Sequence, residues 1–294
     1  ATTALCAASR GHDVTTTEIN PFLVWFGRAK TARYSGSQVR AAQDAAAAAL
    51  THMVGGCAEP VAAPPLHNIE RWWKPDELRF LCSLKGALES SLGDDQVSSS
   101  LLMVAFCRTL IRLSNAAFNQ QSMSFKADDY NLTLLDHHGS DRVRTDLFME
   151  DVGYVLDSAL DNPAGHGVVV YGDARKIEKL VPGLYDVVVT SPPYPNRMSY
   201  IRELRPYMYW LGFLKDPKQA AELDWASIGG TWGAATSRLS EWRGADDGFR
   251  PPYFRAIIDR IADERNTSGH LLSNYVLKYW VCARIWRSAQ LAGS

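Results

Sequence analysis

The sequence lacks several features that would place it in well-known classes of protein. Its five cysteines, at positions 6, 57, 82, 107 and 282, form no Cys-x-x-Cys pair and no metal-ligand spacing. No apolar stretch is long enough to span a membrane, and no signal-peptide pattern precedes the first predicted strand. We therefore expect no metal site and no membrane partner, and we expect reduced, mostly buried thiols in a cytoplasmic protein.

The sequence also has little net charge. It holds 31 Lys and Arg against 32 Asp and Glu, which gives a formal net charge of −1. This balance argues against strong nonspecific binding to DNA, although a local cluster of cations would suffice for a DNA-binding cleft. The glycine-rich stretch 229–233 is not followed by Lys-Ser or Lys-Thr, which excludes a phosphate-binding P-loop, and we interpret it as a mobile loop.

The most informative segment that is present is residues 186–200, DVVVTSPPYPNRMSY. The β-branched run Val187–Thr190 is typical of a buried parallel strand. Pro192 and Pro193 cannot continue a hydrogen-bonded ladder, so the chain has to leave the sheet there. The result is a stiff loop at the carboxyl end of a strand, where open α/β sheets bind their ligands. Its hydroxyl, carbonyl and aromatic ring suit a planar group that bears an exocyclic amine.

This Ser-Pro-Pro-Tyr loop resembles motif IV of the DNA amino-methyltransferases, which methylate an exocyclic base nitrogen. A Ser in first place, preceded by Thr190, is similar to the cytosine-N4 branch, whereas adenine-N6 enzymes more often carry Asp or Asn there. The resemblance implies S-adenosylmethionine (AdoMet) as cofactor and Ser191, Pro192, Pro193 and Tyr194 as the catalytic residues. An ordinary proline turn is the alternative for the tetrapeptide alone.

A second apolar strand pattern, GVVVYGDAR at 167–175, ends in an acid. In AdoMet-dependent methyltransferases an acid at this place accepts a hydrogen bond from the adenine amine of the cofactor, so the resemblance assigns Asp173 that role. Asp173 also suits the N-cap of a helix that begins at Ala174. Both roles can hold together.

A third strand pattern, near the start of the chain, also ends in an acid. Residues 12–18 form it, and Pro21 opens a helix, as proline favours a first helical turn. A carboxylate that closes such a strand can bind both ribose hydroxyls of a nucleotide. Glu18-Ile19-Asn20-Pro21 resembles the acid-x-Asn-Pro stretch of motif II, which implies that Glu18 and Asn20 contact the cofactor. The alternative is a surface Glu before a helix.

The first residues of the chain resemble the helix that comes after the glycine-rich loop of motif I. Residues 1–11 are typical of a helix with a glycine stop, and Thr2 and Thr3 at its start are candidate cofactor contacts. The first strand, the Phe-x-Gly-x-Gly loop and an initiator Met are not found, and no closing β-hairpin is evident at the other end. We therefore expect a chain cut short at both ends, which would bind AdoMet poorly and turn over little.

Between these motifs the sequence is typical of helices. We expect a catalytic domain from residues 1–35 and 165–294, with a helical insertion over 36–164 that serves as a lid, a packing layer or a DNA-contacting element. The insertion offers several candidate phosphate contacts, each explained equally well by a solvated helical face. These are Arg108, Arg112, Lys126, Arg142 and Arg144. Trp72 and Trp73 are expected in the core.

Three arginines come shortly after the tetrapeptide, at positions 197, 202 and 205. Arg197, Arg202 and Arg205 are candidate contacts to the DNA backbone beside an extruded nucleotide, and ion pairing with Glu203 is the alternative. A helix is expected over 201–214, with Pro206 in its first turn or at a kink.

The combined pattern predicts an α/β protein with an incomplete Rossmann-like methyltransferase sheet and a large helical insertion. The expected reaction is methyl transfer from AdoMet to a flipped base in double-stranded DNA, with cytosine N4 favoured and adenine N6 as the alternative. A restriction or phage-defence system is a possible partner. Two other classes stay open: an RNA or protein-glutamine methyltransferase, and a non-catalytic DNA-binding remnant.

Overall fold

The fold of this chain is mostly helical. The computed structural model describes residues 2–117, 124–126, 140–191, 199–230, 234–242, 251–263 and 269–291. Helices dominate these residues, which also contain two short sheets of two strands each. The chain divides into two compact units, 1–16 with 25–169 and 206–215, and 17–24 with 170–205 and 216–294.

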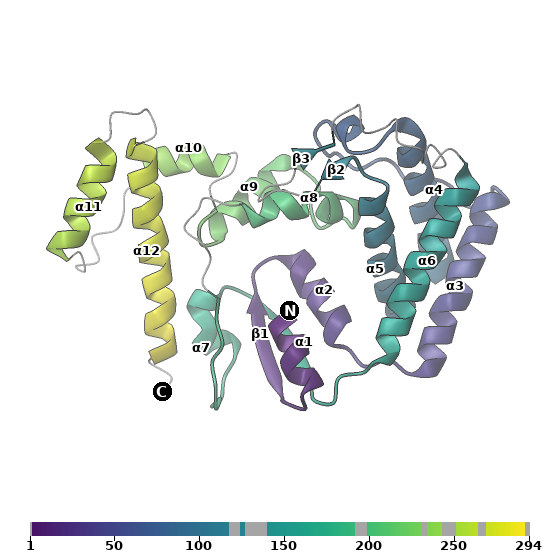
Figure 1. Cartoon of the computed structure of the whole chain (residues 1–294), viewed down its shortest axis with the longest axis horizontal. Coiled ribbons are helices and arrows are strands. Elements are labelled where there is room, and N and C mark those ends of the chain that lie inside the picture. Colours follow the sequence, from purple (N-terminus) through teal and green to yellow (C-terminus); the bar gives the residue numbers. More distant parts are fainter. Residues whose placement is uncertain are drawn as a thin grey trace. The chain divides into compact units, whose positions relative to one another are not determined.

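The first unit is built around a group of long helices that lie side by side (Figure 1). They are α3 (Gly36–Val54), α4 (Pro75–Leu92), α5 (Gln96–Arg112) and α6 (Asp141–Leu160). A capping box of Ser35 and Gln38 starts α3, and Pro75 followed by two acids starts α4. Small apolar residues at helical spacing, such as Ala42, Ala46 and Ala49, are fully buried and let neighbouring helices approach closely. The prediction that this part of the chain is helical is confirmed for these four segments.

Aromatic side chains form the centre of the first unit. Trp73 is fully buried, and its indole N–H donates to the carbonyl of Leu110 at 2.9 Å. Trp72 stacks against it, with ring centroids 5.7 Å apart, and Trp210 meets it edge-on at 5.8 Å. The prediction that Trp72 and Trp73 belong to the core is confirmed. The same unit holds α1 (Thr2–Ser9), the 3₁₀ turn η1 (Ile69–Arg71) and the antiparallel pair β2 (Ala116–Ala117) and β3 (Ser124–Phe125).

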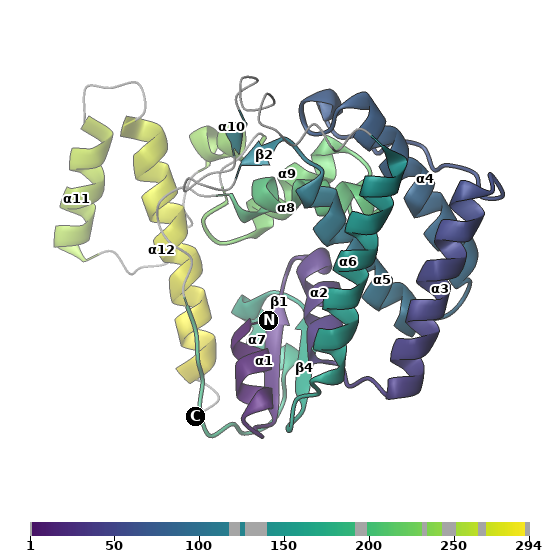
Figure 2. The same ribbon diagram turned by 45° about the vertical axis from the view of Figure 1, so that its right-hand side comes forward.

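The strands β1 (Val14–Glu18) and β4 (Gly167–Tyr171) form a parallel pair, seen side by side in Figure 2. The Val14 N–H donates to the carbonyl of His166 at 2.8 Å, and the Gly172 N–H donates to that of Glu18 at 2.9 Å. Both contacts advance in the same direction along the two strands, as a parallel pair requires. Both strands therefore lie where the sequence predicted them.

The predicted Rossmann-like sheet does not extend beyond this pair among the described residues. The expected buried strand over 187–190 is wrong: Val187, Val188 and Val189 are 73%, 60% and 71% exposed and belong to no strand. A β-branched run favours a strand only where a neighbouring strand can bond its backbone and bury its side chains. The protein is thus a helix-rich α/β mixture, and a full sheet is not formed by the residues described.

The second unit consists of shorter elements and one long helical pair. They are η4 (Ala174–Lys176), α7 (Ile177–Leu180), α9 (Pro217–Ala226), α10 (Ala234–Glu241), α11 (Pro252–Asp263) and α12 (Gly269–Leu291). Helices α2 (Pro21–Thr31) and α8 (Tyr200–Trp210) contribute residues to both units. Helices α11 and α12 lie side by side in Figures 1 and 2. Helix α9 was missed, although Asp216 and Pro217 are a typical N-cap and first residue.

Candidate functional site

The candidate site begins with two carboxylates at the same edge of the parallel pair. Glu18 is the last residue of β1, and Asp173 follows β4 after a single glycine. The N–H of Gly172, the residue before Asp173, donates to the Glu18 carbonyl, so a hydrogen bond joins the backbone of the two strands next to the two acids. Because carboxyl ends of parallel strands meet at one edge, the sequence prediction that both acids lie at strand ends is confirmed.

Glu18 lies in a half-buried position that disfavours its charge. Burial raises the pKa of its carboxyl group, and hydrogen bonds from the N–H groups of Asn20 and Ile19 oppose this effect. The bond from Asn20 N–H to Oε1 is 2.8 Å long. Asn20 itself is buried, and its Oδ1 accepts from the Phe22 N–H at 3.0 Å, which caps the first turn of α2. Asn20, which the sequence predicted as a cofactor contact, thus uses its side-chain oxygen to cap α2.

Asp173 has the opposite electrostatic environment. Burial alone would raise its pKa, but hydrogen bonds from the Arg175 guanidinium and Arg175 N–H, together with the charge of Arg175, hold the pKa below its ordinary value. The Arg175 Nε lies 2.8 Å from each carboxylate oxygen. The Arg175 N–H donates to Oδ1 at 3.0 Å, so Asp173 is the N-cap of η4, as the alternative interpretation predicted.

Arg175 is a member of the site that sequence reasoning missed. Besides Asp173, it donates from Nη2 to the carbonyl of Ala226 at 2.9 Å and from Nη1 to Sγ of Cys282 at 3.4 Å. Nearby, the Lys278 ammonium donates to the carbonyl of Trp225 at 3.1 Å and lies 3.5 Å from the centre of its indole ring. Two cations thus bind the last carbonyls of α9, where a helix dipole favours positive charge.

The Ser-Pro-Pro-Tyr loop is described only at its first residue. Ser191 is exposed, at the end of the exposed run Val187–Thr190. Pro192, Pro193, Tyr194 and Arg197 lie outside the described residues. No contact among the described residues brings the predicted catalytic tetrapeptide together with Glu18 and Asp173, and its role stays a prediction. Thr2 and Thr3 are exposed at the start of α1, and their predicted contact to a cofactor is likewise untested.

One of the arginines after the loop, Arg205, binds the protein's own backbone. Arg202 and Arg205 are half-buried on α8. Pro206 lies inside this helix and has no N–H to offer the carbonyl of Arg202, and the Arg205 Nε donates to that carbonyl instead, at 3.3 Å. This bond gives Arg205 a structural role that the sequence did not reveal.

Most candidate phosphate contacts of the helical segment bind other groups of the protein. Asp151, fully buried on α6, accepts from Arg108 at 3.1 Å, from Arg112 at 3.0 Å and from the Thr109 hydroxyl at 2.8 Å. Arg144 is buried against Glu77 at 3.2 Å. Two further contacts complete the set: Lys126 donates to the Ser114 carbonyl, and Arg112 also pairs with Glu150. Arg142 is exposed. For the arginines and the lysine that form them, these contacts favour a structural role over phosphate binding.

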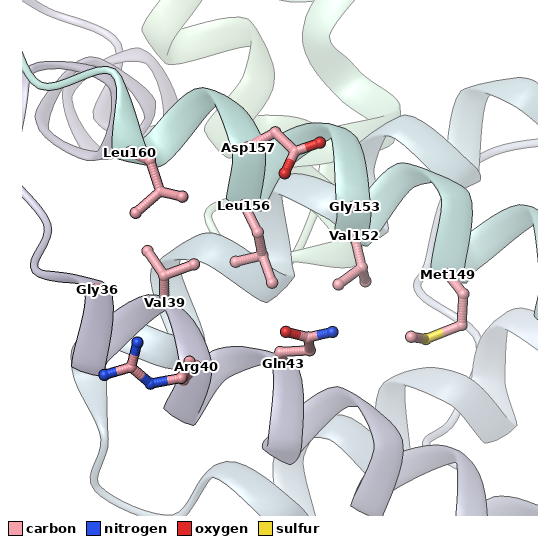
Figure 3. A pocket seen from close by; sticks show the side chains of 10 residues that line it. All are labelled: Gly36, Val39, Arg40, Gln43, Met149, Val152, Gly153, Leu156, Asp157 and Leu160. Carbon is pink, nitrogen blue, oxygen red and sulfur yellow. The ribbon is translucent and has the colours of Figure 1, made fainter.

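A cavity of about 280 Å³ lies between α3 and α6, and neither Glu18 nor Asp173 is among the residues that line it (Figure 3). It is lined by Gly36, Val39, Arg40, Gln43, Met149, Val152, Gly153, Leu156, Asp157 and Leu160.

In the described part of the chain, no three His, Cys, Asp or Glu side chains gather closely enough to hold a metal ion. None of its helices, within the same limits, combines the length and apolar character needed to cross a membrane.

The comparisons with known proteins give no match. No protein-family model, no curated protein and no solved structure is significantly similar to this chain.

Proposed function

We propose that this chain carries the catalytic core of an AdoMet-dependent DNA methyltransferase that modifies the exocyclic amine of a flipped base, with N4 of cytosine as the target. In this proposal β1 and β4 belong to a Rossmann-like sheet. Glu18 binds the ribose hydroxyls of the cofactor, Asp173 accepts from its adenine amine, and Asn20 completes the contacts.

The observation that supports this proposal is that two acids lie at adjacent strand ends and that their pKa values are shifted in opposite directions. A carboxylate that stays ionised, as Asp173 does beside Arg175, is a strong acceptor for an amine. A half-buried Glu18 offers a partly desolvated acceptor, in which a hydrogen bond to a hydroxyl is stronger than in water.

The tetrapeptide supplies the proposed chemistry. The Ser191 hydroxyl and the Pro192 carbonyl accept the amine hydrogens, and Tyr194 stacks on the flipped ring. These contacts would direct the nitrogen lone pair at the methyl group that bound AdoMet would supply. S-adenosylhomocysteine would be the leaving group, and water would take the proton that the amine loses. No cysteine nucleophile is needed, so the protein contributes positioning and electrostatics.

The direct test is methyl incorporation from labelled AdoMet into DNA, RNA and protein by the purified product of the complete gene. Tyr194→Ala should abolish incorporation into DNA, because the flipped base loses a stacking partner worth roughly 1–3 kcal/mol and its alignment. Tyr185→Ala, at an exposed tyrosine shortly before the loop, is the matched control and should keep activity. Incorporation only into RNA or protein would replace the proposed substrate, and none into any of them would refute the activity.

A further inference from the structure

We propose that Ser199 and Asp224 form a positioning pair for methyl transfer, which fixes the start of α8 through a buried hydrogen bond to α9. This inference rests on the proposed function and adds two residues to it. Neither residue was singled out by the sequence pattern, since their partners lie far apart in the chain.

The pair is buried, short and directional. The Ser199 hydroxyl donates to Oδ1 of Asp224 at 2.5 Å, and the two residues are 7% and 1% exposed. The same hydroxyl accepts from the Arg202 N–H at 3.2 Å, the usual bond of a serine at a helix N-cap. A cap needs only the accepting bond. The second bond, to a carboxylate from another helix, ties the orientation of this cap to α9.

The surroundings of Asp224 hold it in one place. A Cβ atom on Gly230 would lie 1.7 Å from the Asp224 carbonyl oxygen, so only glycine fits where the chain passes. Gly229 beside it has a left-handed φ of +84°, which glycine adopts without strain. The glycine pair, interpreted from sequence as a mobile loop, therefore packs tightly against the end of α9 in this unit.

The end of α9 also connects to the proposed cofactor acid. Asp224, Trp225 and Ala226 are consecutive, and they contact the Ser199 hydroxyl, the Lys278 ammonium and the Arg175 guanidinium respectively. Arg175 in turn binds Asp173. Burial lowers the pKa of Lys278, the positive charge of Arg175 lowers it further, and Cys282 and Asp224 oppose both effects.

The last turn of α9 links these hydrogen bonds within the second unit. They run from Asp173 through Arg175 to the last turn of α9, and from Asp224 to Ser199. Asp173 precedes the tetrapeptide in the sequence and Ser199 comes after it, so these bonds hold the chain on both sides of that segment. Because methyl transfer in line needs close alignment of donor and acceptor, a shift of about 1 Å at such a support can cost about 100-fold in rate.

The test compares three serine variants of the product of the complete gene. Ser199→Ala removes both bonds, Ser199→Thr keeps a hydroxyl, and Ser227→Ala is the matched control. Ser227 lies at the same end of α9, and its hydroxyl donates only to the Leu223 carbonyl among the contacts described, at 2.9 Å. We would measure the AdoMet Kd by calorimetry, kcat and KM for DNA methylation, and the melting temperature.

The expected result is a split between binding and turnover. Ser199→Ala should lower kcat about 10- to 100-fold with less than about a twofold change in AdoMet Kd, Ser199→Thr should restore most of kcat, and Ser227→Ala should match the wild type. An active Ser199→Ala protein would overturn the positioning role while leaving the proposed function intact. Equal losses of kcat, binding and melting temperature would reduce the pair to a structural support. A wild type without methyl transfer would overturn both proposals.

Discussion

At the scale of single residues, Glu18 and Asp173 are the acids of the proposed cofactor site. The two acids lie at neighbouring strand ends, yet burial raises one pKa and Arg175 lowers the other. Their environments, and not their residue types, favour different partners for them.

Removal of either carboxylate should weaken cofactor binding. Asp173→Ala and Glu18→Ala each delete a charge-assisted hydrogen bond worth about 1.5–3 kcal/mol, or roughly 10- to 100-fold in Kd. Calorimetry with AdoMet measures the effect on the product of the complete gene. Asp13→Ala is the control, since this exposed acid precedes the other end of β1 and should leave Kd unchanged. Unchanged affinity in both site variants would rule out the cofactor assignment.

The pH dependence of binding should follow Glu18. In the proposed site the ionised Glu18 carboxylate accepts from the ribose hydroxyls, so AdoMet affinity should fall as the pH drops through the raised pKa of Glu18, while Asp173 stays ionised to lower pH. Glu18→Gln should remove this acidic limb from a series of calorimetric titrations. A limb that persists unchanged in Glu18→Gln would assign it to another group.

The same shifts predict opposite contributions to stability. The lowered pKa of Asp173 stabilises the fold fully above the unfolded value, about 3.9, and this contribution is lost as the pH falls through the folded pKa. The raised pKa of Glu18 favours the fold at low pH, and that contribution is lost as the pH rises through its folded pKa. Urea unfolding at several pH values, with Glu18→Gln and Asp173→Asn, would separate the two.

At the scale of elements, contacts between α5 and α6 show how buried charge is used in the first unit. Asp151 holds Arg108, Arg112 and Thr109 together, and the Arg108 guanidinium also lies 3.9 Å from the centre of the Tyr154 ring. Such a network fixes the register of two helices. It accounts for cations that would otherwise suggest a DNA-binding surface.

Loss of the Asp151 carboxylate should destabilise this helical group. Asp151→Ala leaves two arginines and a buried hydroxyl without their acceptor, which should cost about 2–3 kcal/mol, somewhat below a fully buried pair because both arginines are partly exposed. Glu150→Ala, which breaks the exposed pair with Arg112, should cost less than about 1 kcal/mol. The midpoint of urea unfolding measures both. Similar small losses would show that the network contributes little.

Elements with local signals were predictable from sequence, and those with distant partners were not. Pro21 and Pro75 mark helix starts because proline suits a first turn, and Asp173 caps η4 as its type suggests. The run Val187–Thr190 has strand-like residues but no strand in the structure, since a strand also needs a neighbour. Ser199 and Asp224 bond across 25 positions, and no local pattern announces such a contact.

At the scale of the whole molecule, the structure brings two acids together, whereas the target base is inferred from the sequence alone. Residues 18 and 173 come together because two strands separated by a long helical segment pair in parallel. The strand patterns at both ends of this segment predicted the two strands, and the structure adds that they pair with each other. The helical segment between them has a coherent core, but nothing in its described contacts assigns it a ligand.

The choice of cytosine depends on the first residue of the tetrapeptide. Ser191 is a short, neutral acceptor preceded by Thr190, whereas the acid or amide of adenine enzymes reaches further. Both types only need to accept a hydrogen from an amine, so the product has to be measured.

The most direct measurement is nucleoside mass spectrometry of DNA from cells that express the complete gene. We predict N4-methylcytosine in these cells and none in cells that express Tyr194→Ala. Methyladenine without N4-methylcytosine would correct the target base and leave the role of Tyr194 in place. DNA with neither modified base, from cells that contain the folded protein, would contradict the proposed methylation of DNA.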